Sequence, residues 1–315
     1  MYLTLNSLFL LLIGFFSCNL ILKKLLPFLK ETIIDHPNKR SSHKLPTPTS
    51  GGISFIIISL ISGLIYNNNL PFICLPLALI GLLDDLYGLN KTIRFLFQIC
   101  TSFFLISINF NFDLSNIVQI NSLLIMFFLI LFSTTVINFI NFMDGIDGLV
   151  ITSLLLIFAS GMIKHNFDNY IFIGALLSFA IANKSPAKLF MGDVGSTFLG
   201  AYLVGLGFKL NNFQDTIWFF SLATPLLFDA FSCLFRRFIN SKNIFESHKN
   251  HLYQRLHQAG WSHNKVTLLF SSEIFILCCS YLLANILITL LLVLVFIILN
   301  LYFDKKFAVT FKESF

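Results

Sequence analysis

Charged side chains are scarce in this sequence. Only 11% of its 315 residues are Asp, Glu, Lys or Arg, whereas 56% are hydrophobic. A soluble domain has about a quarter of its residues charged, and no segment here is polar and long enough to form one. Apolar runs of about 20 residues, the length that crosses a bilayer core, recur from end to end. The composition therefore indicates a membrane protein with many spans.

A metal-binding cysteine motif and a cleavable leader are also missing. The six cysteines all lie in apolar runs and form no C-x-x-C pair, which favours small packing residues over metal ligands. Lys23 and Lys24 follow the first apolar run instead of preceding it, which is the reverse of a cleaved signal peptide. We therefore expect a retained first helix with its N-terminus on the outer side.

The apolar runs predict an all-α bundle of about 10–11 transmembrane helices, with bounds good to a few residues. The expected spans are 4–22, 51–66, 70–83, 95–110, 122–140, 148–163, 170–183, 197–209, 216–235, 266–283 and 285–302.

The basic residues predict the orientation of this bundle. If the loop 23–50 is cytoplasmic and the spans alternate, all of the 21 Lys and Arg except Lys164 and Lys209 fall on the cytoplasmic side. This positive-inside pattern predicts a periplasmic N-terminus and a cytoplasmic C-terminus. It also explains the net charge of +6 without a nucleic-acid partner.

Residues 1–315 are thus expected to form a single integral-membrane domain in the lipid bilayer. The expected outer loops are short, whereas the inner ones are long or rich in Asp, Asn, His, Gly and Lys. Chemistry is therefore expected on the cytoplasmic face, in the loops 23–50, 84–94, 141–147, 184–196 and 236–265.

Acidic residues stand at or near the inner ends of several spans. Asp84 and Asp85 end one apolar run, and adjacent carboxylates repel unless a cation lies nearby. Asp193 in MGDVGS follows a glycine, in a turn suited to a metal–diphosphate complex. Helix-end solvation and an ordinary capped turn are the alternatives. Asp229 lies inside an apolar run, where an unpaired acid is costly, and its role stays open.

The stretch NFINFMDGIDGLV combines amides with acids. Asn138, Asn141, Asp144 and Asp147 recur every three residues, so they share one face for as long as a helix lasts. Amides suit a uracil edge or a sugar hydroxyl, and carboxylates offer oxygen ligands to Mg²⁺. A capped turn with Asp147 as N-cap is the alternative, but it explains only one of these residues.

Basic residues in two inner loops are candidates for phosphate binding. Lys44 precedes the second span, where a basic juxtamembrane loop is the alternative interpretation. The loop before the last two spans holds His251, Arg255 and His263 among other histidines. Zinc is one interpretation of these histidines, but no cysteine joins them in the sequence and no H-x₃-H pair is present. Phosphate binding fits better, and an amphipathic surface helix is the third option.

Together these loops bring acids for a divalent cation and cations for phosphates to one membrane face. The matching reaction class is phosphoryl transfer from a nucleotide donor to a lipid acceptor, since such transfer depends on positioning and charge neutralisation. A transporter, with acids near the midplane and often in repeated halves, and a non-catalytic scaffold are the alternatives.

Five motifs in this order resemble those of glycosyltransferase family 4, the polyprenyl-phosphate N-acetylhexosamine-1-phosphate transferases. That family includes enzymes that initiate common antigen and O-antigen, and the phospho-MurNAc-pentapeptide translocase. The motifs, within residues 35–263, are HKLPTPTSGG, GLLDDLYGL with Arg94 and Gln98 following, NFINFMDGIDGL, MGDVGS and the histidine loop.

The resemblance implies an activity in the bacterial inner membrane. A UDP-N-acetylhexosamine would donate sugar-1-phosphate to undecaprenyl phosphate, release UMP and initiate O-antigen or another envelope polysaccharide. Pentapeptide transfer in peptidoglycan synthesis is an alternative. Mg²⁺ or Mn²⁺ is the implied cofactor, a homodimer is one option, and no nucleic acid is involved.

The resemblance also implies roles for particular residues. The metal would be held by Asp193, with help from Asp144 or Asp147, of which Asp144 is the one we expect. The implied catalytic residues are Asp84, Asp85, Asp144 and Asp147. The implied substrate-binding residues are Lys44, Arg94, Asn138, Asn141, His251, Arg255 and His263.

Two departures from the family pattern concern the transferred sugar. The common-antigen enzymes have H-I-H-H where this chain has HLYQ, so His251 alone is kept, and Thr49 stands where many members have Arg. The pattern is similar to the O-antigen branch, which transfers sugars such as N-acetylfucosamine or N-acetylquinovosamine.

Overall fold

The computed structural model describes residues 5–37, 42, 45–109, 122–210, 212–244, 246, 248–311 and 314. Within these residues the chain forms thirteen helices and one pair of two-residue strands. The elements are α1 (Leu5–Thr32), β1 (Ile34–Asp35), β2 (Thr47–Pro48), α2 (Ile53–Ile65), α3 (Leu70–Tyr87), α4 (Lys91–Asn109), α5 (Ser122–Phe142), α6 (Leu149–His165), α7 (Tyr170–Asn183), α8 (Gly192–Phe208), α9 (Phe213–Ser221), α10 (Thr224–Ile239), α11 (Leu252–Gln258), α12 (His263–Leu283) and α13 (Ile286–Phe307).

The predicted all-α membrane bundle is confirmed. Six of the described helices are long and apolar enough to cross a bilayer, and α9 with α10 makes a seventh if the bent pair is one span. The helices α2, α6 and α7 are shorter and apolar. Each predicted span coincides with one or two of the observed helices, while the number of spans and their orientation stay predictions.

Two predicted boundaries are wrong. The span 216–235 is not continuous, because α9 and α10 meet at a bend of 74°. Pro225 lies in the first turn of α10, where its missing N–H is not needed. The loop expected from residue 23 is partly helical, since α1 continues to Thr32.

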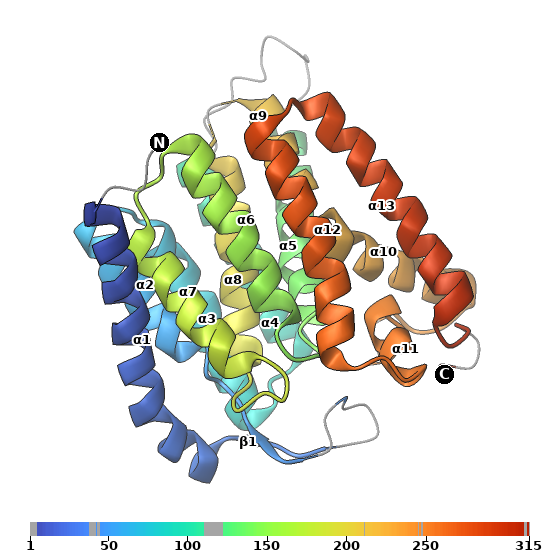
Figure 1. Ribbon diagram of the computed structural model, residues 1–315, viewed down its shortest axis with the longest axis horizontal. Coiled ribbons are helices and arrows are strands. Elements are labelled where there is room, and N and C mark those ends of the chain that lie inside the picture. Colours follow the sequence, from blue (N-terminus) through green and yellow to red (C-terminus); the bar gives the residue numbers. More distant parts are fainter. Residues whose placement is uncertain are drawn as a thin grey trace.

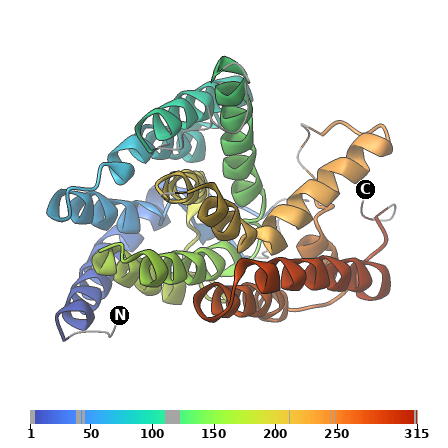
Figure 2. The ribbon, with the colours of Figure 1, turned by 90° about the horizontal axis from the view of Figure 1, so that it is seen from above.

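The helix α8 lies at the centre of the bundle. Every residue from Val194 to Phe208 is buried, and α8 contacts α2, α3, α4, α5, α6 and α9. Figure 2 shows the other helices arranged around it, with α10 extending outward. A helix that is apolar on all sides is stable only in such a position. This places the N-terminus of α8, and the MGDVGS motif, in the middle of one end of the molecule.

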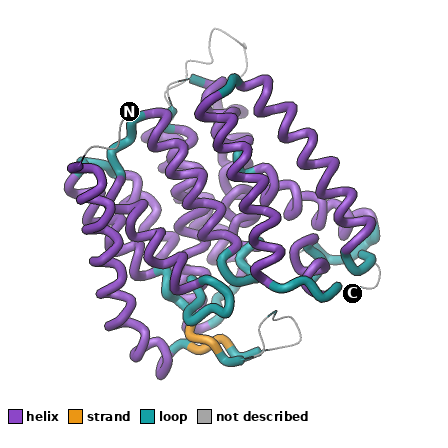
Figure 3. The backbone as a smooth tube through the Cα atoms, in the orientation of Figure 1, coloured by secondary structure: helices purple, strands orange, loops and turns teal. Residues whose placement is uncertain are grey.

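The segments that attracted attention in the sequence meet at this end of the bundle. In Figure 1 the connections α3–α4, α5–α6 and α7–α8 lie at the lower end, together with α11. Figure 3 shows the strand pair at the same end, beneath the helices. The strands pair antiparallel, with Ile34 opposite Pro48 and Asp35 opposite Thr47. Alternating helix directions therefore collect acids that are far apart in sequence on one side of the bundle.

Candidate active site

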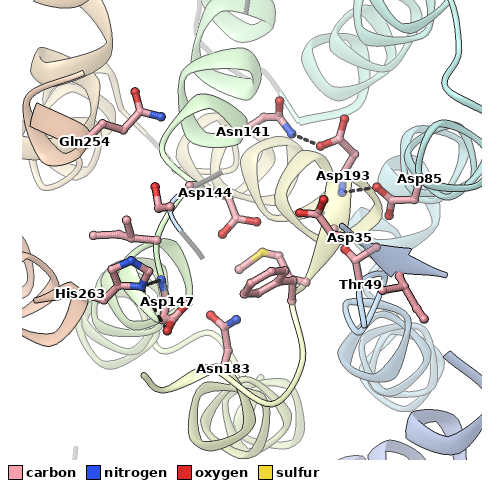
Figure 4. A pocket seen from close by; sticks show the side chains of 17 residues that line it. Asp35, Thr49, Asp85, Asn141, Asp144, Asp147, Asn183, Asp193, Gln254 and His263 are labelled. Atoms are coloured by element: carbon pink, nitrogen blue, oxygen red, sulfur yellow. Dashed lines mark hydrogen bonds and ion pairs between the residues drawn. The ribbon is translucent and has the colours of Figure 1, made fainter. Parts of the chain in front are cut away.

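A cavity of about 400 Å³ lies at this end of the bundle. Figure 4 shows carboxylates, amides and one histidine pointing toward it from several helices and loops. The sequence-predicted residues that line it are Asp85, Asn141, Asp144, Asp147, Asp193 and His263.

Asp193 occupies the first turn of α8. Its Oδ1 accepts a hydrogen bond of 3.0 Å from Asn141 Nδ2, and its Oδ2 lies 2.9 Å from Arg94 Nη1. Asn141 also donates to Ser196 Oγ at 2.8 Å. The carboxylate is thus oriented by α4 and α5 at a helix N-terminus, which favours negative charge.

Asp85 and Asp84 have different partners although they are adjacent in sequence. Asp85 accepts hydrogen bonds from Asp193 N at 2.9 Å and Ser50 Oγ at 2.7 Å, and it lines the cavity. Asp84 accepts from Leu89 N at 2.7 Å and pairs with Arg94. Arg94 therefore bridges Asp84 and Asp193, which relieves the repulsion that the sequence predicted for two neighbouring acids.

Glycines allow the backbones around these acids to approach closely. A Cβ on Gly52 would lie 2.5 Å from Gly195 Cα, and a Cβ on Gly81 would lie 2.6 Å from Asp193 O. Gly192 has φ +73°, and its Cβ would lie 2.2 Å from Asp85 Oδ2. At Gly192 both the positive φ and the close carboxylate require glycine.

Asp147 lies beyond α5 in the turn that leads to α6. Its Oδ2 lies 3.1 Å from His263 Nδ1 and accepts a 3.1 Å hydrogen bond from Ala187 N. Burial raises the pKa of Asp147, but the hydrogen bond and charge of His263, with the Ala187 N–H, bring it below its ordinary value. The N-cap of α6 is Gly148, so the interpretation of Asp147 as that N-cap is wrong.

Asp144 donates its backbone N–H to Asn141 O at 3.2 Å, but its carboxylate, which faces the cavity, has no hydrogen-bond or ion-pair partner among the described residues. Burial raises its pKa well above the ordinary value, and the charges of Asp193, Asp85 and Asp147 add to the effect. A divalent cation bound by carboxylate oxygens would remove this repulsion. The donor set therefore fits a hard cation such as Mg²⁺.

Asn138 belongs to a contact between helices in the structure. Its Nδ2 donates to Gln98 Oε1 at 2.7 Å, and Gln98 Nε2 donates to Asn138 Oδ1 at 3.1 Å. This pair of amides joins α5 to α4 one turn behind the cavity. Asn138 is not among the residues that line the cavity.

His251 and Arg255 are also placed behind the cavity wall. Arg255 is 2% exposed; its guanidinium lies 2.6 Å from Asp304 and donates to Val309 O at 2.9 Å. His251 is 3% exposed and lies beside Asp229. Lys44 lies outside the described residues.

Asp229 has a structural role that the sequence did not reveal. Its carboxylate accepts hydrogen bonds from the backbone N–H groups of Leu252 at 2.7 Å and Tyr253 at 3.0 Å. These groups begin α11, where a negative charge is favourable. Asp229 therefore fixes the histidine loop to α10.

Several cavity residues were not predicted as site residues. Asp35 comes from β1, Asn183 from the end of α7 and Gln254 from α11. Ser50 holds Asp85 from the loop before α2. Asn183 accepts from the backbone N–H of Gly148 at 3.0 Å. None of them stands in a spacing that marks a site, so only their positions in the fold identify them.

Comparison with known proteins places this arrangement in a family. The family model Glycosyl transferase family 4 matches residues 70–211, which carry most of the acids described above. An undecaprenyl-phosphate alpha-N-acetylglucosaminyl 1-phosphate transferase of Thermotoga maritima is 32% identical, over 72% of this chain and 75% of the relative.

Two further relatives are transferases of related substrates by name. A phospho-N-acetylmuramoyl-pentapeptide-transferase of Fervidobacterium nodosum is 30% identical, over 73% of this chain and 80% of the relative. A decaprenyl-phosphate N-acetylglucosaminephosphotransferase of Mycobacterium leprae is 28% identical, over 75% of this chain and 73% of the relative. The resemblance drawn from the motifs is confirmed, and the chain belongs to glycosyl transferase family 4.

Proposed function

We propose that this chain transfers N-acetylhexosamine-1-phosphate from a UDP-sugar to undecaprenyl phosphate. The products would be UMP and a polyprenyl-diphosphate-linked sugar that initiates O-antigen or another envelope polysaccharide. The observation that carries this proposal is the cavity lined by Asp85, Asp144, Asp147 and Asp193 at one end of a membrane bundle. The polyprenyl-phosphate sugar transferases among its relatives support the same reaction class.

Asp193 and Asp144 are the proposed ligands for Mg²⁺ or Mn²⁺. Asp193 is oriented by Asn141, and Asp144 has a carboxylate with no described protein partner, so both can present oxygens to one cation. When bound, the cation would neutralise the diphosphate of the donor and the charge of departing UMP. Asp147 is already held by His263, so we assign it to the shape and charge of the cavity.

In the proposed transfer, an oxygen of undecaprenyl phosphate forms a bond to the phosphorus that bears the sugar. The bond from that phosphorus to the UMP phosphate breaks, and its electron pair leaves with UMP. Asp85 lines the cavity and would orient or deprotonate the lipid phosphate. Asp84 would act through Arg94, whose second contact is Asp193. Arg94 would also attract the anionic donor.

Among the implied substrate-binding residues, Asn141 and His263 line the cavity, and we assign donor contacts to these two first. Asn138 and Arg255 are held by other protein groups, and His251 lies beside Asp229 outside the cavity lining, so we propose that all three support the cavity wall. A direct contact from Lys44 stays a prediction.

The reaction would take place at the cytoplasmic face of a bacterial inner membrane, with 10–11 spans and a periplasmic N-terminus. This orientation rests on the distribution of Lys and Arg. Labelling of single cysteines with a membrane-impermeant reagent in intact cells tests it. A cysteine in the short α2–α3 turn should react, and one in the α7–α8 turn should not.

The decisive experiment measures release of UMP and formation of radiolabelled lipid by the purified chain with undecaprenyl phosphate. The donor panel is UDP-GlcNAc, UDP-FucNAc, UDP-QuiNAc and UDP-MurNAc-pentapeptide. One donor should give Mg²⁺-dependent product. Asp193→Asn should abolish it, while Asp215→Asn, the same change in α9 at the opposite end, should retain it. A transporter or scaffold would release no UMP with any donor, which would overturn the proposal.

A further inference from the structure

Cys233, His248 and His251 form a second cluster of chemically reactive side chains outside the cavity. Cys233 comes from α10, and the two histidines precede α11. One ligand atom from each residue lies within 4.8 Å of the other two. Cys233 Sγ is 3.9 Å from His248 Nδ1, and the ring centroids of His248 and His251 are 5.1 Å apart. The cysteine that the sequence appeared to lack is therefore supplied by the fold.

The cluster contains a buried polar atom without a partner. His251 is 3% exposed, and its Nδ1 makes no hydrogen bond of ordinary geometry to any described residue, although the backbone N–H of Gln254 faces this side chain in a capping box. The closest acid, Asp229, has its Oδ1 3.6 Å away, too far for a hydrogen bond. An unpaired buried nitrogen is unfavourable, and a ligand bound among these side chains would satisfy it. Cys233, at 2% exposed, faces the same space.

One thiolate and two imidazoles are ligands for a borderline-soft divalent cation. Zn²⁺ takes such ligands in a tetrahedral arrangement, whereas Mg²⁺ and Ca²⁺ require oxygen. Zn–S and Zn–N bonds of about 2.3 and 2.1 Å place ligand atoms about 3.4–3.6 Å apart. The ligand atoms lie within 4.8 Å of one another, so the excess is at most about 1.4 Å, which rotation of the histidine side chains can close.

The surrounding charges are compatible with such a cation. The Asp229 carboxylate lies beside His251 and already accepts two backbone hydrogen bonds, so its negative charge is fixed close to the site. Three arginines, Arg255, Arg237 and Arg236, act electrostatically on Cys233. Each already has a partner: Arg237 Nη1 donates to Asn250 Oδ1, and Arg255 and Arg236 pair with Asp304. A thiolate and Asp229 together balance a divalent cation. A solvent molecule or an Asp229 oxygen would supply the fourth ligand.

From these contacts we propose that Cys233, His248 and His251 form a structural Zn²⁺ site, separate from the carboxylate cavity. None of the three lines that cavity. The site would tie the segment before α11 to α10, and α11 carries Gln254 to the cavity wall. The cation would thus hold a cavity wall in place without contacting the substrates.

The test uses the full chain, stripped of metals and purified in detergent, with excess Mg²⁺ present to occupy carboxylate sites. Titration with Co²⁺ should give an intense sulfur-to-metal charge-transfer band that saturates at one equivalent. Zn²⁺ should abolish this band by competition. Cys233→Ser should remove the band, and His248→Gln should weaken Zn²⁺ binding at least tenfold. Cys278→Ser, a change at another buried cysteine, should leave the charge-transfer band and the affinity for Zn²⁺ unchanged.

A measurement on the unaltered chain guards against variants that fail to fold. X-ray absorption of the Zn²⁺-loaded protein should show one sulfur at about 2.3 Å and two imidazole nitrogens at about 2.0–2.1 Å. A shell of oxygen alone would overturn the proposal. So would a charge-transfer band that persists in Cys233→Ser, or the absence of any band in the unaltered chain. Transfer activity is not the readout, so failure of this site and failure of the proposed reaction are distinguishable.

Discussion

Gly192→Ala should both slow transfer and destabilise the fold. The added Cβ would lie 2.2 Å from Asp85 Oδ2 and 2.8 Å from Ser50 N, so the carboxylate has to move by about 1 Å to reach ordinary contact. That movement breaks the 2.7 Å hydrogen bond from Ser50 Oγ. The predicted effect is therefore on the position of Asp85 in the cavity.

The magnitude follows from that hydrogen bond and from the backbone. A hydrogen bond to a charged group contributes about 1.5–3 kcal/mol. If the displacement of Asp85 raises the activation free energy of transfer by this amount, the transfer rate falls roughly 10- to 150-fold, at about 1.36 kcal/mol per factor of ten. The positive φ of Gly192 adds about 1–2 kcal/mol of strain for alanine, which appears in the free energy of unfolding.

Gly88→Ala is the matched control. Gly88 has φ +65°, close to the +73° of Gly192, but a Cβ there would meet nothing within 4 Å. Both variants carry the strain of a positive φ, and Gly192→Ala should lose more stability in thermal unfolding in detergent because its Cβ also meets the Ser50 backbone. Only Gly192→Ala should lose transfer, measured as the initial rate of UMP release. Equal rates for the two variants would refute the assignment of Asp85 to the reaction.

Three further outcomes are expected. Asp193→Asn should abolish activation by Mg²⁺, because the amide is a poor substitute for a carboxylate ligand; an unchanged Mg²⁺ dependence of the rate would contradict the metal assignment. His263→Gln should destabilise the fold by about 1 kcal/mol at pH 7. In unfolding measurements this difference should begin to shrink as the pH falls below about 4 and should vanish below the lowered native pKa of Asp147, because the folded carboxyl is protonated only there. Glu273→Gln should raise the melting temperature. Among the described residues Glu273 Oε1 and Asn300 Oδ1 are unpaired, while Asn300 Nδ2 donates to Glu273 Oε2. A glutamine there could donate to Asn300 Oδ1 and still accept from Asn300 Nδ2, and a lower melting temperature than that of the unaltered chain would contradict this reasoning.

The membrane architecture and most of the acidic centre could be predicted before the fold was known. Span length and apolarity are local properties, so each predicted span coincides with helix in the structure. The MGDVGS motif and the pair Asp84 and Asp85 stand where apolar runs begin or end. Because successive spans alternate in direction, these motifs fall at the same end of the bundle. Asp85, Asp144 and Asp193 were accordingly predicted and do line one cavity.

The roles within these motifs could not be predicted, because neighbouring residues in a motif have different surroundings. Asp84 pairs with Arg94 while Asp85 faces the cavity, and no spacing rule distinguishes two adjacent acids. Asn138 shares a helix face with Asn141, yet its amide is paired with Gln98 on α4. Such hydrogen-bond partners depend on how the two helices pack against each other, which the sequence does not specify.

The sequence by itself determined a helical membrane bundle, the end that carries the acids and the family to which the chain belongs. The length of each apolar run, the breaks at Gly and Pro, and the order of the motifs can all be read from the linear sequence. Only the tertiary structure decided that Asp229 holds the start of α11, and that Cys233 lies beside His248 and His251. These contacts arise because α10 packs against the loop that follows it, and side chains distant in sequence then share a single environment.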